Sequence, residues 1–383
     1  MNIHPFQIHI EQQQLEDLEQ RLRHVRWSRP FDARGWEDGS SLDFMRRLVN
    51  YWRTQFDWRA QEARLNRLPQ FVATIADLSI HFIHQRGVGP APLPLILTHG
   101  WPGSFVEMER IIPLLADPAA HGADPADAFD VVVPSLPGYG FSQAPGQPGF
   151  SSARIAELWL SLMDQLGYAR FGAQGGDVGA GVSTWLARRF PEAVVGYHLN
   201  YISGGYRPPL GDGQPPITDE ERAFLDSASA WAAAEGAYAH LHGTKPQTLA
   251  FALNDSPVGL AAWIVEKFRA WSDCDGDVER VFSFDALLTD ICLYWFSGTV
   301  DASLRVYKEN RLEPLQFQPG ERATPPLGVA LFPRELPMPP RSWVERSHNV
   351  VRWTHLPKGG HFAAMEQPEL LAADIRAFFR PLR

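Results

Sequence analysis

The sequence has few cysteines, no basic cluster and no hydrophobic leader. Only two of its 383 residues are cysteine, Cys274 and Cys292, which is too few for a disulfide framework. The formal net charge is −9 with scattered lysines and arginines, which argues against nucleic acid or an anionic membrane surface as a partner. Residues 1–27 are rich in Gln, Glu and Arg and show only amphipathic helical spacing, so we expect no membrane anchor or signal peptide there. A cytoplasmic location follows from the low cysteine content.

Hydrophobic residues make up 45% of the chain, which is enough to form a large core. No repeat or low-complexity segment interrupts it. The changing strand and helix patterns predict four parts. Residues 1–90 form an amino-terminal extension with helices at about 11–25 and 40–56 and strands near 71–76 and 78–84. Residues 91–203 form the first part of a core, 204–320 a helical lid and 321–383 the second part of the core.

Within the two core parts, strand and helix patterns alternate. Apolar or alternating runs predict strands at 93–98, 130–134, 169–173, 194–199, 327–332 and 350–356. Helical patterns lie between or after them, at about 152–166, 181–190 and 368–379. Alternation of this kind is typical of an α/β protein with right-handed connections and a mostly parallel central sheet.

The segment Gly175-Gly176-Asp177-Val178-Gly179 lies between a predicted strand and a predicted helix. Small residues on both sides of a central side chain are typical of a nucleophile elbow, a strained turn that raises that side chain above the sheet. Here the raised group is a carboxylate, which attacks saturated carbon and leaves an ester for a second step to hydrolyse. The alternative is a glycine-rich turn in which Asp177 only caps the helix.

Two further candidates follow the elbow in the order nucleophile, acid, histidine that α/β-hydrolases use. Glu335 and His361 each come just after a predicted strand, where open α/β sheets place their ligands. Taken singly, Glu335 could be a solvated loop residue and His361 a turn residue. Their order and positions together indicate a catalytic triad with Asp177.

A loop that could stabilise an oxyanion precedes the elbow in the sequence. The strand at 93–98 runs into His99-Gly100-Trp101-Pro102, and the fold builds its oxyanion hole from such a loop and from the residue after the nucleophile. The backbone N–H groups of Trp101 and Val178 are therefore the candidate donors, since Pro102 has none. An ordinary Gly-Pro turn is the alternative.

These residues, with several longer strings, resemble the microsomal-type epoxide hydrolases, a family that includes juvenile-hormone epoxide hydrolases and soluble bacterial relatives. The resemblance spans nearly the whole chain and rests on residues 5–27, 51–71, 99–104, 136–142, the elbow, 252–260, 306–310 and 359–364. It implies an α/β-hydrolase fold with a mostly parallel central sheet, a helical lid insertion and an amino-terminal helical extension.

The resemblance also implies a reaction and roles for five side chains. Asp177 would be the nucleophile, His361 the base that activates water, and Glu335 the acid that orients His361. Tyr238 and Tyr307, both in the predicted lid, would donate hydrogen bonds to the epoxide oxygen. The substrates would be a small apolar epoxide and water, the product a vicinal diol, and no cofactor would be needed.

The sequence departs from the family at Val178, where we expect a tryptophan. The backbone N–H is unaffected, but the pocket beside the carboxylate should have a different shape. His240 and His242 have no acidic or cysteine cluster around them in the sequence, so no metal site is expected. A homo-oligomer is compatible with the sequence. Two other functions stay open, namely a dehalogenase with the same Asp nucleophile, for which Trp101 could serve as a halide donor, and a non-catalytic ligand-binding protein.

Overall fold

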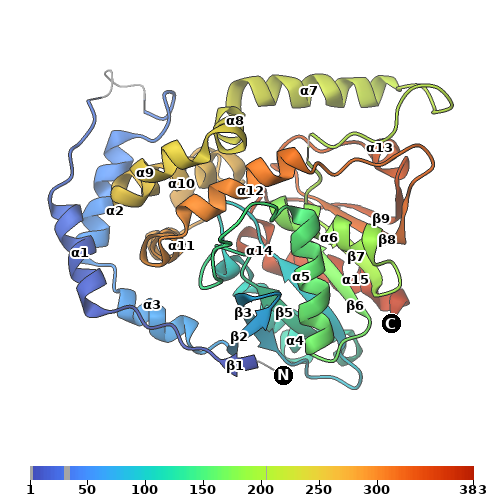
Figure 1. Cartoon of the computed structure of the whole chain (residues 1–383), viewed down its shortest axis with the longest axis horizontal. Helices are drawn as coiled ribbons and strands as arrows, with labels where there is room; N and C mark the ends of the chain where they lie inside the picture. The colour runs from blue at the N-terminus through green and yellow to red at the C-terminus, as the bar shows by residue number, and fades with distance from the viewer. Residues whose placement is uncertain (1–2, 30–34, 204) are drawn as a thin grey trace.

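The computed structural model describes residues 3–29, 35–203 and 205–383. Residues 1, 2 and 30–34 of the predicted extension, and residue 204 at the start of the predicted lid, lie outside this part. The described residues form one nine-stranded sheet in the order β1-β2-β3-β5-β4-β6-β7-β8-β9 (Figure 1). Strands β1 to β3 and the β3–β5 pair are antiparallel, and the rest of the sheet from β5 to β9 is parallel. This is the mostly parallel sheet of an α/β-hydrolase.

The strands are short and the buried central ones are almost entirely apolar, as parallel strands covered on both faces must be. Their bounds are β1 Ile3–Pro5, β2 Gln70–Ile75, β3 Leu78–Gln85, β4 Leu93–Thr98, β5 Phe129–Pro134, β6 Phe171–Gly175, β7 Val194–Leu199, β8 Ala323–Leu331 and β9 His348–His355.

The helices fall into an amino-terminal group, a core group and a lid group. The first comprises α1 Gln12–Arg23, α2 Leu42–Thr54 and α3 Trp58–Leu65. The core group comprises α4 Ile111–Ala116, α5 Ser152–Gln165, α6 Asp177–Arg189, α13 Arg341–Glu345, α14 Ala363–Glu366 and α15 Pro368–Phe379. The lid group comprises α7 Asp219–Glu235, α8 Ala237–Thr244, α9 Pro246–Asp255, α10 Pro257–Trp271, α11 Phe284–Ser297 and α12 Val300–Leu312.

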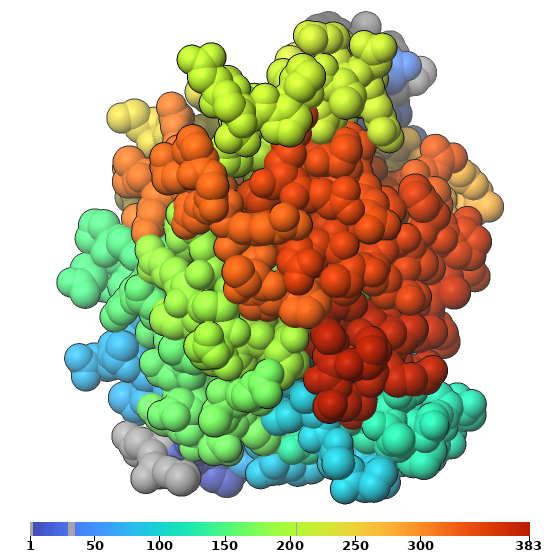
Figure 2. All heavy atoms as spheres, turned by 90° about the vertical axis from the view of Figure 1, so that its right-hand side faces the viewer, coloured from blue at the N-terminus to red at the C-terminus, as the bar shows by residue number. Residues whose placement is uncertain are grey.

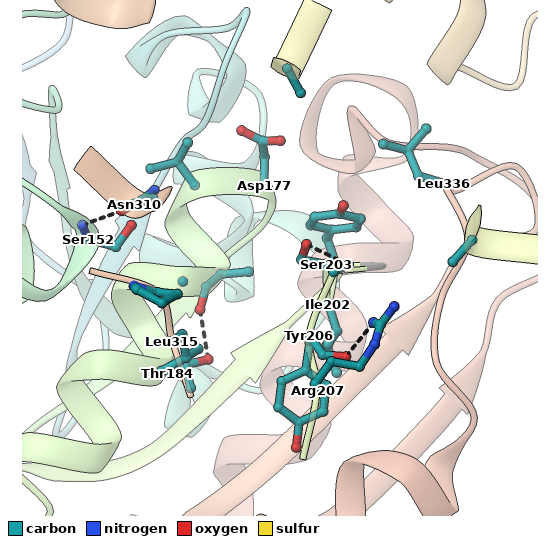
Figure 3. A pocket seen from close by; sticks show the side chains of 18 of the residues that line it. Ser152, Asp177, Thr184, Ile202, Ser203, Tyr206, Arg207, Asn310, Leu315 and Leu336 are labelled. Atoms are coloured by element: carbon teal, nitrogen blue, oxygen red, sulfur yellow. Dashed lines mark hydrogen bonds between the residues drawn. The ribbon is translucent and has the colours of Figure 1, made fainter. Parts of the chain in front are cut away.

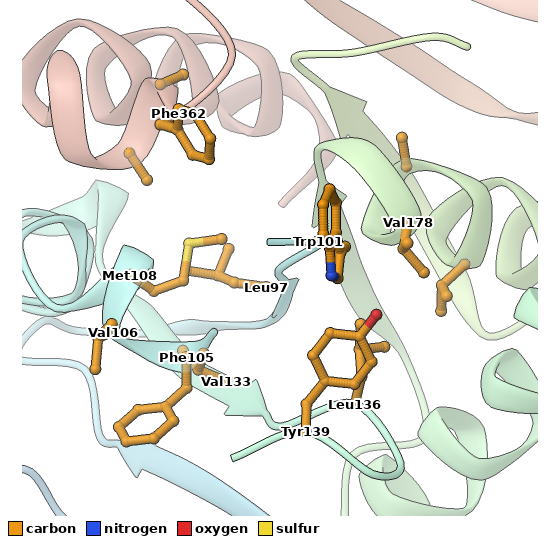
Figure 4. Packing of buried hydrophobic residues seen from close by; sticks show 14 of the residues in the cluster. Leu97, Trp101, Phe105, Val106, Met108, Val133, Leu136, Tyr139, Val178 and Phe362 are labelled. Atoms are coloured by element: carbon orange, nitrogen blue, oxygen red, sulfur yellow. The ribbon is translucent and has the colours of Figure 1, made fainter. Parts of the chain in front are cut away.

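Helices α6 and α15 cover opposite faces of the sheet, as two glycines of β6 show. A side chain at Gly172 would meet Phe379 of α15, and one at Gly175 would meet the backbone of Gly179 in α6. Because side chains alternate between the faces of a strand, positions three residues apart point in opposite directions. The core between these layers includes the cluster around Leu97, Phe105, Val133 and Leu136 (Figure 4).

The lid helices lie above the carboxyl ends of the parallel strands, and the amino-terminal helices α1 and α2 pack on lid helices α10 and α11 (Figure 1). Arg21 of α1 donates to the backbone carbonyl of Asp255, and the Tyr51 hydroxyl of α2 donates to the Asp285 carboxylate at 3.0 Å. In Figure 2, α7 and the loop before it form the upper edge of the molecule, above the carboxyl-terminal segment. These hydrogen bonds join the amino-terminal extension to the lid.

Several elements begin or end where the sequence patterns place them, and others do not. Strands β4 and β7 and helix α15 have the expected bounds. The elbow helix begins at Asp177, four residues earlier than expected, because glycines inside it hide the helical pattern. The helix expected at about 11–25 is α1, and β1 and an extended segment precede it. Helix α3 was not foreseen.

No single helix in the described part of the chain is both long and apolar enough to cross a membrane. Helices α9 and α10 would pass that test together on length and composition, but they meet at a bend of 116°.

Replacing Gly179 with alanine tests the close packing of α6 on the sheet. Its added methyl would lie 1.9 Å from the backbone oxygen of Thr98, so helix and strand must separate. We expect a loss of about 1–3 kcal/mol of unfolding free energy, measured by denaturant titration. Gly243→Ala is the matched control, because its methyl would make an ordinary 3.6 Å contact with Arg311. Equal stability of the two variants would contradict the packing argument.

Candidate active site

The Asp177 carboxylate is raised by a strained turn at the start of α6. Asp177 has φ of +48°, a left-handed conformation that is costly for a residue with a side chain. Close-packed glycines make room for this turn. A Cβ at Gly100 would lie 2.3 Å from the Cβ of Asp177, and one at Gly176 would lie 2.7 Å from the amide of Asn200. The sequence prediction of an elbow at this position agrees with the geometry.

The loop after β4 meets this carboxylate. The Trp101 backbone N–H donates to Asp177 Oδ1 at 2.8 Å. His99 is buried and holds the loop in place, since its Nε2 accepts from the Leu136 backbone N–H, and burial lowers the pKa of His99 to about 4. The Trp101–Pro102 peptide bond is cis. Of the two predicted backbone donors, Trp101 thus already bonds the carboxylate.

His361 and Glu335 come together because the loops after β8 and β9 pair with each other. A parallel bridge joins Arg334 to Gly360, and it places Glu335 Oε1 2.6 Å from His361 Nδ1. The other ring nitrogen, His361 Nε2, lies 3.4 Å from Asp177 Oδ2. The Glu335 and His361 side chains are 1% and 3% exposed, so little water screens their interaction. The three predicted triad side chains therefore form one connected chain.

Two carboxylates that the sequence reasoning missed hold the loop of His361. Glu366 accepts from the backbone N–H groups of Asp273, Gly360 and Phe362, and Asp273 accepts from that of Gly359. Burial raises the pKa of Glu366 to about 7. In the sequence, Glu366 is a helical Glu before Gln-Pro, and no pattern there distinguishes it from a solvated residue.

The two predicted tyrosines meet across the ring of Trp101. The Tyr238 ring stacks on Trp101 at 5.3 Å between centroids, and the Tyr307 ring meets it edge-on at 5.9 Å. Burial and the Asp177 charge raise the pKa of Tyr238 well above its ordinary value, and burial followed by the neighbouring phenol does the same for Tyr307. The two phenols interact electrostatically, but the Tyr307 hydroxyl forms no regular hydrogen bond within the described residues. Both are therefore protonated donors at neutral pH.

The charge state of His361 reflects a balance of opposing effects. Burial alone lowers its pKa, because a charged imidazolium is poorly solvated inside the protein. The nearby carboxylates of Glu335 and Asp177 outweigh burial and hold the pKa of His361 well above its ordinary value. In the free protein, Glu335 and Asp177 therefore favour the imidazolium form of His361.

A cavity of 710 Å³ opens beside Asp177, Tyr238 and Tyr307, a size typical of small-molecule sites. Figure 3 shows Asp177 at the start of α6, with Leu336 across the cavity and Thr184 further along the helix. Its walls are largely apolar and include Val178, Ala180, Trp185, Leu199, Ile202 and Leu336. The site thus combines a carboxylate, two phenols and an apolar wall.

One of the two histidines considered for a metal pair, His242, lies beside these rings. His242 is buried between the Trp101 and Tyr307 rings, and its Nε2 accepts from the Trp263 indole. Burial lowers the pKa of His242 to about 3. Within the described residues, no group of three or more His, Cys, Asp or Glu side chains is arranged to hold a metal ion.

Comparisons with known proteins agree with this geometry. Residues 3–108 match the family model for the epoxide hydrolase N terminus, and residues 94–239 match that for the alpha/beta hydrolase fold. A putative epoxide hydrolase of Stigmatella aurantiaca is 45% identical over 100% of this chain and 86% of its own length. Epoxide hydrolase 1 of Oryctolagus cuniculus is 40% identical over 98% of this chain and 88% of its own length.

A solved structure supports the same assignment. The epoxide hydrolase of Aspergillus niger superposes with a TM-score of 0.88 at 32% identity, covering 100% of this chain and 97% of that one. Sequence, fold and site geometry agree, and the chain belongs to the epoxide hydrolase family, hydrolases with the α/β-hydrolase fold.

Proposed function

We propose that the protein opens an apolar epoxide through a covalent ester on Asp177, which water activated by His361 then hydrolyses to the diol. The observation that carries this proposal is the placement of Asp177. Its Oδ1 is held by the Trp101 N–H, its Oδ2 faces His361, and two protonated phenols line the same cavity. A displacement at saturated carbon needs this combination of nucleophile and acid on one substrate.

In the first step, an oxygen of Asp177 attacks one epoxide carbon, and the carbon–oxygen bond on the ring breaks. Negative charge develops on the departing oxygen, where Tyr238 and Tyr307 donate hydrogen bonds and one of the two transfers its proton. Hydrogen bonds from two phenols stabilise the negative charge on a departing halide less than the charge on an epoxide oxygen. This pair, together with the names of the relatives, favours the epoxide over the halide reaction.

In the second step, His361 takes a proton from water, and the oxygen adds to the ester carbonyl of Asp177. Esterification removes the negative charge of Asp177, one of the charges that raise the pKa of His361. The pKa of His361 must therefore fall when the ester forms, which makes the imidazole available as a base. The Trp101 N–H, joined by that of Val178, stabilises the oxyanion, and Glu335 holds the imidazole.

The cavity supports an elongated apolar epoxide as the substrate. The cavity follows α6 from Val178 to Trp185, a rise of seven residue steps or about 10 Å along the helix. Val178 forms the wall beside the nucleophile and leaves more room there than the tryptophan that we expected from the family.

A single-turnover reaction in heavy-oxygen water tests the ester route. We expect label in the peptide that contains Asp177, because water adds to its carbonyl and one of its original oxygens leaves with the diol. His361→Gln should accumulate the ester, visible as a substrate mass on the intact protein. Diol formation without label would show direct attack by water and refute the proposal.

Replacing both Tyr238 and Tyr307 with phenylalanine should slow alkylation by at least about 10²-fold, because the epoxide oxygen loses its donors. Stopped-flow measurement of ester formation, beside the decay of the preformed ester, separates the two steps. Tyr206→Phe is the matched control, since Tyr206 lines the same cavity but its hydroxyl bonds Ser347. Equal slowing of alkylation and ester decay in the double variant would remove the proposed role.

Glu335→Gln should move the pH profile of ester hydrolysis. Hydrolysis needs neutral His361, so its rate rises as pH passes through the pKa of this residue in the ester. The charge of Glu335 raises that pKa. Its removal should shift the rising limb toward lower pH and lower the plateau, because the imidazole is no longer held. A profile that stays in place, measured from pH 5 to 9, would contradict the assignment.

A further inference from the structure

A second, much smaller cavity lies against Asp177. It has a volume of 20 Å³, and Asp177 is the only described residue that lines both this cavity and the large one. About 10–15 Å³ is enough to hold a single water molecule. Its polar lining includes Glu107, Gln174, Asn200 and His361. The cavity is too small for a substrate, but it has the size and polarity of a water site beside the base.

Two acidic residues line the small cavity, and of these Asp177 belongs to the reaction described so far whereas Glu107 does not. It belongs to the short 3-10 turn Phe105–Met108, whose other side chains are buried in the core (Figure 4). Burial, the nearby Asp290 and the Asp177 charge together raise the pKa of Glu107 well above its ordinary value, while His361 opposes the rise. The carboxyl group is therefore electrostatically coupled to both reacting side chains.

The neighbouring loop leaves room for this carboxyl group. A Cβ at Gly103 would lie 1.5 Å from Glu107 Oε1, so any side chain at position 103 would displace the carboxyl from its place. Gly103 does not have positive φ, and backbone conformation alone does not demand glycine there. The absent side chain is explained by the space that the Glu107 carboxyl occupies.

We propose that the Glu107 carboxyl binds the hydrolytic water in the small cavity and orients it toward the ester carbonyl of Asp177. The inference rests on the proposed ester route. The water gives one proton to His361 Nε2 and donates its second O–H to a Glu107 oxygen, while its lone pair forms the new bond to the ester carbon. The tetrahedral intermediate then breaks the bond to the substrate oxygen, and the proton on His361 passes to that oxygen as the diol leaves. The water proton that remains on the Asp177 carboxyl group restores the tyrosine that protonated the epoxide oxygen in the first step.

Either protonation state of Glu107 serves this role, because a carboxylic acid and a carboxylate both offer an oxygen that accepts a hydrogen bond. The first step does not involve water. Glu107 therefore acts only in ester hydrolysis, which distinguishes it from Tyr238 and Tyr307.

Rapid-mixing kinetics of Glu107→Ala test the proposal with the same epoxide as the wild type. We expect alkylation to change less than threefold and ester hydrolysis to fall by about 10²-fold, so that the ester accumulates during turnover. Glu107→Gln keeps an acceptor oxygen of similar reach and should recover most of the hydrolysis rate. Gly103→Ala should reproduce the slow hydrolysis with Glu107 intact, because its methyl displaces the carboxyl.

Glu109→Ala is the matched control, since this nearby glutamate pairs with Arg64 and should affect neither step. Thermal unfolding of each variant checks the fold. If Glu107→Ala slows both steps equally, or slows neither, the inference is wrong. If His361→Gln forms no ester at all, the proposed function itself fails, whereas an ester in His361→Gln with normal hydrolysis in Glu107→Ala overturns only the role of Glu107.

Discussion

The close approach of helix α6 to strand β4 is the constraint on which the rest of the site depends. Gly179 allows the first turn of the helix to lie directly on the backbone of Thr98, the last residue of the strand. The loop that carries Trp101 starts at the next residue, so the same contact sets the distance between the Trp101 N–H and the Asp177 carboxylate. A single methyl group at this contact would change the geometry of the nucleophile and of its donor together.

Around this contact the protein gathers several acidic groups near one imidazole. Glu335 and Asp177 contact His361 directly, and Glu107 is coupled to it from the small cavity. These carboxyl groups can lie close together because their surroundings favour different protonation states. Glu335 and Asp177 raise the pKa of His361 and so favour its cationic form, while burial raises the pKa of Glu107 and favours its neutral form. In the proposed ester, Asp177 has lost its negative charge, so the charge beside His361 changes.

Much of this site could be predicted because its residues follow chain order and strand ends. Asp177, Glu335 and His361 were found from their positions after predicted strands, and strand β7 had its expected bounds. The role inferred for Glu107 could not be read from the sequence, because it depends on the empty space at Gly103 and on the cavity shape. The role of Glu366 could not be predicted for a similar reason, since its three backbone donors come from two separate loops.

The lid was predicted as a helical region, but its packing was not. Tyr238 and Tyr307 are far apart in sequence and meet because helix α8 packs on helix α12, and both rings also contact Trp101, which belongs to the core. Helical periodicity identifies an apolar face but does not say which aromatic ring it will meet. The strand β1 and the helix α3 were missed because each is too short to show a clear period.

The contacts between the amino-terminal helices and the lid have a consequence for the order in which the chain folds. Arg21 bonds to Asp255, 234 residues later, and Gln14 bonds to the carbonyl of Phe296, 282 residues later. Synthesis proceeds at about 5–20 residues per second, so the lid residues that bind α1 and α2 are made on the order of 10–50 s after these helices. Helices α1 and α2 leave the ribosome before the lid does, so they can dock only after the lid has been synthesised.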